Sequence, residues 1–121
     1  MDDYLFRPDE SEEFETEERC HILEIINDPS ETKLSLARAR VLPGVTTAWH
    51  RLKGTTETYY ILDGQGLVEI GESMQKNVKS GDAVLIPADT AQRITNTGET
   101  DLLFLCYCAP SFGAESYESL E

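Results

Sequence analysis

The sequence has few basic residues and no long apolar run. Its 121 residues include 10 Lys and Arg against 23 Asp and Glu, which gives a formal net charge of −13. This balance argues against nonspecific nucleic-acid binding, which needs Lys and Arg to neutralise phosphates, and against docking on anionic membranes. No segment approaches the roughly 18 apolar residues of a transmembrane helix. We therefore expect neither a nucleic-acid partner nor a membrane partner.

Cysteine is also scarce, and a secretory signal is not recognisable. The three cysteines, Cys20, Cys106 and Cys108, form neither an even-numbered framework nor a C-x-x-C metal motif. The first residues, MDDYLFRPDESEEFETEE, are acidic where a signal peptide is basic and then apolar. These features predict a cytoplasmic protein with free, buried thiols.

Length and charge distribution suggest one domain with acidic ends. The chain is long enough for a single self-supporting core. Residues 1–19 carry nine carboxylates, a density typical of a solvated segment. We predict an acidic N-terminal arm over residues 1–19, a folded body over 20–113 and an acidic C-terminal tail over 114–121.

The body contains short β-rich runs separated by turn signals. The runs are CHILEIIND, KLSLARARVL, ETYYILDG, GLVEIGE, DAVLIPAD, QRITNT and DLLFLCYCA. Strands at this spacing, with no helical period between them, indicate an all-β sandwich or barrel. Within this pattern, Asp63-Gly64 predicts a hairpin between the strands on either side.

Two spaced motifs narrow the fold further. The first runs from Gly44 through His50, Leu52 and Glu57 to Gly64. It matches the pattern G-x5-H-x-H-x(3–4)-E-x6-G, except that leucine occupies the second histidine position.

The second motif follows at a short interval. It comprises Gly81, Pro87, Asp89, Gln92 and Asn96. It matches G-x5-P-x-G-x2-H-x3-N, except that aspartate replaces the second glycine and glutamine replaces the histidine.

Together the motifs make residues 34–110 resemble a small single-domain member of the cupin superfamily (cupin 2 type), in particular uncharacterised prokaryotic cupins with an HRL-x-GTTE first motif. The resemblance implies an all-β, double-stranded β-helix (jelly-roll) barrel, here with an extended N-terminal arm. It also implies a homodimer.

The same resemblance implies a site in the barrel mouth. In the family, the motif positions supply three imidazoles and one carboxylate to a divalent metal. This chain retains His50 and Glu57, has Gln92 at a histidine position, and has the non-coordinating Leu52 at another. We expect His50, Glu57 and Gln92 to hold any divalent ion (Mn, Zn or Ni), although one nitrogen and two oxygens form a weak set for borderline metals.

Other residues are candidates for the ligand pocket. Tyr59 shares the strand parity of Glu57, so it either faces the cavity as a hydrogen-bonding wall beside Gln92 or is a core tyrosine with a satisfied hydroxyl. Arg38 and Arg40 share one face of their strand. That face either meets solvent or lines the cavity, and in the second case the guanidinium groups would favour an anionic ligand.

Two functions follow from these residues. In the first, His50 and Glu57 act as general acid and base on a small polar, sugar-like or carbonyl-like compound, in an isomerase or epimerase reaction. In the second, the protein is a non-catalytic ligand-binding or sensory cupin with a degraded metal site. Fold alone does not decide between them.

Overall fold

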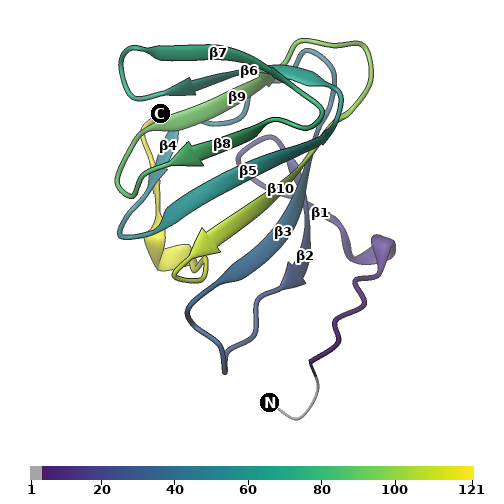
Figure 1. Cartoon of the computed structure of the whole chain (residues 1–121), viewed down its shortest axis with the longest axis vertical. Coiled ribbons are helices and arrows are strands. Elements are labelled where there is room, and N and C mark those ends of the chain that lie inside the picture. The colour runs from purple at the N-terminus through teal and green to yellow at the C-terminus, as the bar shows by residue number, and fades with distance from the viewer. Residues whose placement is uncertain (1–3) are drawn as a thin grey trace.

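The strands form two antiparallel sheets that face each other (Figure 1). The computed structural model describes residues 4–121. Residues 1–3, the start of the predicted arm, lie outside the described residues. The six-stranded sheet has the order β1 (Phe14–Glu15), β2 (His21–Ile26), β3 (Ser35–Val41), β10 (Leu102–Ala109), β5 (Thr56–Asp63) and β8 (Ala83–Ile86).

The five-stranded sheet completes the barrel. Its order is β11 (Tyr117–Ser119), β4 (His50–Leu52), β9 (Gln92–Asn96), β6 (Gln65–Ile70) and β7 (Met74–Lys79). Two short 3-10 helices, η1 (Glu10–Glu12) and η2 (Ala114–Ser116), precede β1 and β11. The predicted all-β fold is thereby confirmed. Among residues 4–121, no helix has the length and apolar character that a membrane crossing needs.

The core lies between the two sheets. Alternate residues of each strand point inward, as the pleat requires. The inward residues of both sheets form one apolar cluster that includes Val41, Ile61, Val68, Ile94, Leu102 and Phe104. Some members of this cluster, among them Ala39, Tyr59 and Phe104, also line a cavity inside the barrel.

The predicted hairpin at Asp63-Gly64 is wrong. The strand before it, β5, pairs with β10 and β8, whereas β6 after it pairs with β7 and β9. The chain therefore crosses between sheets at Gly64, whose φ is +88°. A Cβ there would lie 2.9 Å from the carbonyl oxygen of Asp101. Glycine is required because the backbones approach closely and φ is positive.

Parts of the predicted arm and tail belong to the sheets. β1 lies within residues 1–19 and pairs with β2, with Phe14 opposite Ile22. β11 lies within residues 114–121 and pairs with β4, with Tyr117 opposite Leu52. Both acidic segments thus reach the open end of the barrel, where they contribute to its walls.

Candidate functional site

A cavity of about 310 Å³ lies between the two sheets, lined by both apolar and polar residues. A volume of this order suits a small organic molecule. The lining comes from the N-terminal segment, both sheets and the C-terminal segment, and it includes Glu17, Glu18, Cys20, Glu24, Ala39, His50, Glu57, Tyr59, Cys106, Cys108 and Tyr117. The motif residues His50 and Glu57 therefore face one common space, as the sequence predicted.

Glu57 is the most unusual residue of this cavity. It lies on the central strand β5 between β8 and β10 and is only 7% exposed. Its Oε2 accepts a weak hydrogen bond from Cys108 Sγ at 3.8 Å, and its Oε1 has no hydrogen-bond partner. Burial raises the pKa of the Glu57 carboxyl to about 7, and the neighbouring Gln92 amide offsets only part of this effect. At neutral pH the group is therefore divided between the acid and the carboxylate.

His50 presents one defined ring nitrogen to the cavity. Its Nδ1 lies 2.7 Å from the carbonyl oxygen of Ala48, which can only accept, so Nδ1 donates the proton. The opposite nitrogen, Nε2, lies 3.4 Å from Glu18 Oε1. The ring also stacks on Tyr117, with centroids 5.1 Å apart. These contacts fix both the tautomer and the orientation of the imidazole.

Glu18 is a site residue that sequence reasoning missed. It lies in the N-terminal segment, and its side chain is 22% exposed. Burial raises the pKa of its carboxyl, while the nearby His50 lowers it. In the acidic run of residues 1–19, nothing in the sequence distinguished this glutamate from its neighbours.

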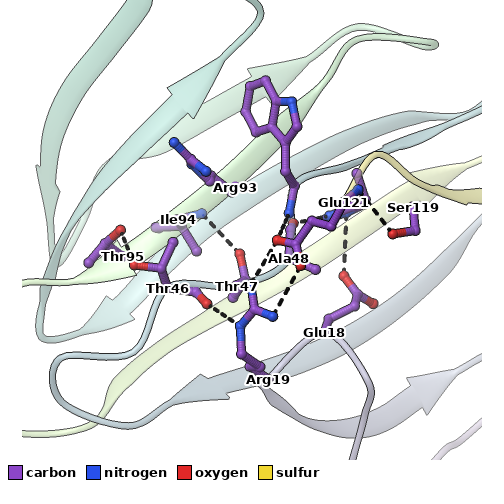
Figure 2. Close-up of polar contacts among 12 residues, drawn as sticks. Glu18, Arg19, Thr46, Thr47, Ala48, Arg93, Ile94, Thr95, Ser119 and Glu121 are labelled. Carbon is purple, nitrogen blue, oxygen red and sulfur yellow. Dashed lines mark hydrogen bonds and ion pairs between the residues drawn. The ribbon is translucent and has the colours of Figure 1, made fainter.

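Hydrogen bonds of Glu18 itself and of the next residue, Arg19, fix the backbone at this point. The Ala48 N–H donates to the Glu18 carbonyl oxygen at 3.0 Å. Arg19 Nε donates to the Thr46 carbonyl oxygen at 2.8 Å, and its guanidinium pairs with Glu121 at 2.8 Å (Figure 2). Arg19 thus ties the N-terminal segment to the β3–β4 connection and to the C-terminal residue, which holds Glu18 beside the imidazole.

Tyr59 and Gln92 form a buried pair. The Tyr59 hydroxyl donates to Gln92 Oε1 at 2.5 Å, and both residues are almost fully buried. Tyr59 lines the cavity and its hydroxyl is also satisfied, so both alternatives for this residue hold. Among the described residues, Gln92 is not one that lines the cavity, which corrects its assignment to the ligand pocket. Gln92 occupies the register position opposite His50, between β4 and β9.

The donor set does not fit the predicted metal. Gln92 Oε1 already accepts the Tyr59 proton, and Leu52 has no donor atom. Burial raises the pKa of all three cysteine thiols, which keeps them protonated and makes them poor ligands. Within the described residues 4–121, no group of three or more His, Cys, Asp or Glu side chains could hold a metal ion. His50 and Glu57 alone are too few donors for Mn, Zn or Ni.

Arg38 and Arg40 do not line the cavity, which corrects their assignment to the ligand pocket. They lie on the outer face of β3, and Ala39 between them points inward. Arg38 pairs with Glu10 and Glu13, and Arg40 pairs with Glu13 and Asp101. Sequence alternation placed the two arginines on one face, and their acidic partners in the N-terminal segment decide which face it is.

Comparisons with known proteins agree with this architecture. Residues 37–108 match the family model of the cupin domain. The chain is 39% identical over 89 residues to an uncharacterised protein of Methanocaldococcus jannaschii, which covers 74% of this chain and 70% of that protein. It is 36% identical over 69 residues to an oxalate-binding protein of Thermotoga maritima, which covers 57% of this chain and 56% of that protein.

Solved structures share the fold at lower identity. The nucleoside dehydratase Pac13 has a TM-score of 0.82 and 18% identity, covering 98% of this chain and 92% of that chain. Variants of the Streptomyces protein have been solved with uridine. A predicted oxalate decarboxylase from T. maritima has a TM-score of 0.73 and 25% identity, covering 87% of this chain and 93% of that chain.

Proposed function

The chain belongs to the cupin family, and we propose that it binds a small polar ligand in the cavity and moves protons on it with His50 and Glu57, without a metal. The observation that carries this proposal is the buried Glu57 carboxyl, whose Oε1 has no hydrogen-bond partner and whose side chain lines the same cavity as the imidazole. A buried carboxyl is costly unless something compensates it. A bound ligand would supply that compensation.

We assign complementary roles to His50 and Glu57. Glu57, with a pKa of about 7, can take or give a proton near neutral pH. His50 Nε2 serves as the second proton carrier, because Nδ1 donates to the Ala48 carbonyl oxygen and leaves Nε2, which lies 3.4 Å from Glu18 Oε1, as the nitrogen that can accept a proton. Such a pair suits removal of a proton beside a carbonyl group and return of a proton elsewhere on the same molecule, which is isomerase or epimerase chemistry.

Solvent deuterium incorporation tests this proposal. The protein is incubated in D2O with a panel of small aldoses, ketoses, amino-carbonyl compounds and uridine, and exchange at carbon is followed by proton NMR. We expect exchange that persists in EDTA and is lost in Glu57→Gln and His50→Gln. The exposed Glu72 provides the matched control Glu72→Gln, which should keep full activity. Exchange that disappears with EDTA and returns with added metal would contradict metal-free proton transfer.

A non-catalytic ligand-binding protein is the second candidate. The Tyr59–Gln92 hydrogen bond favours it, since a position that binds metal in the family is here used for a buried structural contact. In the same NMR assay, line broadening of a panel compound without deuterium incorporation would select this function.

We also propose that the protein is cytoplasmic, a location that its free thiols fit.

We further propose that the protein forms the homodimer expected from its family. Tyr60, Leu85 and Tyr107 lie on neighbouring strands of the outer face of the six-stranded sheet and are 46%, 67% and 43% exposed. An apolar cluster of this kind is typical of a contact surface. Sedimentation velocity should show a dimer that Leu85→Lys converts to a monomer, and a monomeric parent protein would contradict the proposal.

A further inference from the structure

We infer that the ligand of this cavity carries a positive charge, as a small organic ammonium compound does. This inference rests on the proposed function only in taking the cavity as the ligand site. Four glutamate side chains line the space, those of Glu17, Glu18, Glu24 and Glu57. Among the lining residues in the described part of the chain, none is Lys or Arg. A cavity with low-dielectric walls and charges of one sign concentrates ligands of the opposite sign.

The unpaired Oε1 atom of Glu57 is the acceptor that we expect the cationic group of the ligand to contact. Glu57 is 7% exposed, its Oε1 lacks any hydrogen-bond partner, and it lines the cavity. An unpaired buried acceptor calls for a donor, and a charged donor gives the stronger hydrogen bond. Glu18 lies beside His50 in the same lining and adds a second partly buried carboxylate.

Aromatic rings complete the surroundings of a cation. Phe14, Tyr59, Phe104, Phe112 and Tyr117 all line the cavity. The faces of such rings attract ammonium groups within about 6 Å of the ring centroid. A mixture of carboxylates and aromatic faces recognises both the charge and the apolar substituents of an organic ammonium ion.

The structure also argues against an anionic ligand such as oxalate. The nearest candidate cations from the sequence, Arg38 and Arg40, lie on the outer face of β3 and are paired with Glu10, Glu13 and Asp101. A dicarboxylate in the cavity would meet carboxylates with no guanidinium to compensate them. This chain therefore differs in ligand charge from what the name of its oxalate-binding relative states.

The cysteines allow a test that does not require knowing the ligand. The chain has 3 cysteines, and all three line the cavity. Burial keeps the three thiols largely protonated, so only a small thiolate fraction reacts, and this fraction is the same for both reagents. The thiolate attacks a methanethiosulfonate reagent to form a mixed disulfide and release methanesulfinate. The cationic trimethylammonium-ethyl reagent and the anionic sulfonatoethyl reagent are compared by intact-protein mass spectrometry, and each rate is divided by the same reagent's rate with free cysteine.

We expect the normalised rate of the cationic reagent to exceed that of the anionic reagent by about tenfold or more, which corresponds to ~1.4 kcal/mol. Glu57→Gln and Glu18→Gln should each reduce this ratio, by about threefold. Glu72→Gln removes one negative charge outside the cavity lining and should leave the ratio unchanged. A ratio of one or below overturns the inference.

A second experiment uses reversible ligands, two of which have the same shape and differ only in charge. Choline, its neutral isostere 3,3-dimethylbutan-1-ol and oxalate are compared at up to 50 mM by thermal denaturation of the same proteins. A larger Tm increase with choline, diminished in Glu57→Gln, supports the inference. A larger or equal increase with the isostere or with oxalate overturns charge recognition and leaves the small-ligand proposal intact. No Tm increase with choline, the isostere or oxalate overturns the inference, while the deuterium-exchange assay still tests the proposed function separately.

Discussion

Glu57 gives the protein a stability that depends on pH in an unusual direction. Its pKa is about 7 in the folded chain against an ordinary value of 4.5. The folded chain therefore holds this proton more tightly than the unfolded chain does. The contribution of the group to stability is fully present below pH 4.5 and is progressively lost as the pH rises to about 7, because the folded state must then bury a charge.

The magnitude follows from the two pKa values. At 1.36 kcal/mol for each pKa unit, the difference corresponds to about 3 kcal/mol of lost stability above pH 7. This is a large part of the 5–15 kcal/mol that is typical of folded domains. Glu57→Gln removes the titration and keeps the shape of the side chain. We expect the variant to gain about 3 kcal/mol relative to the parent protein between pH 4.5 and pH 8.

Urea denaturation at pH 4.5, 5.5, 6.5, 7.5 and 8 measures this difference. The comparison uses the change in relative stability with pH, since the new amide has its own hydrogen-bonding cost that is the same at every pH. Glu72→Gln, at an exposed position, serves as the control and should follow the parent curve. Parallel curves for Glu57→Gln and the parent protein would refute the argument that burial raises the pKa of Glu57.

Three further outcomes follow from the same structure. Tyr59→Phe leaves the buried Gln92 Oε1 without its donor, and we expect a loss of about 1–3 kcal/mol in urea denaturation; an unchanged midpoint would contradict this. Gly64→Ala brings a Cβ to 2.9 Å from the Asp101 carbonyl oxygen at a φ of +88°, and should cost about 2 kcal/mol or more; a stable variant would show that the crossing can shift. Dialysis against EDTA should leave Tm unchanged, because the donor set does not fit a metal; a fall in Tm restored by one divalent ion would reveal a site that these donors do not account for.

Much of the fold and the centre of the site could be predicted from local patterns. The strand runs and their punctuation predicted an all-β fold. The motif spacing singled out His50 and Gln92, which pair on neighbouring strands, and Glu57, which lines the same cavity as His50 from the opposite sheet. Asp63-Gly64 was misread because a glycine with positive φ serves a hairpin and a crossing between sheets equally well. Only the pairing of the next strand distinguishes the two, and pairing is a long-range property.

The residues that sequence reasoning missed depend on contacts between distant segments. Glu18 becomes a site residue because Arg19 is tied to Thr46 and Glu121. No periodicity in an acidic run marks one carboxylate for burial. The outward orientation of the Arg38 side chain likewise depends on its ion pair with Glu13, which lies in the segment predicted to be a solvated arm.

Two glutamates of that N-terminal segment have pKa values shifted in opposite directions, down for Glu13 and up for Glu18. Glu13 holds the segment in place, whereas Glu18 belongs to the cavity. Hydrogen bonds from Arg40 and Arg38 hold the pKa of Glu13 at about 2, against an ordinary value of 4.5. Its contribution to stability is therefore present above pH 4.5 and is lost only as the pH falls towards 2. Burial raises the pKa of Glu18 and Glu57 instead. Above pH 4.5 the ion pairs of Glu13 with Arg38 and Arg40 are fully formed, so changes in stability or ligand binding between pH 4.5 and 8 do not arise from loss of these pairs.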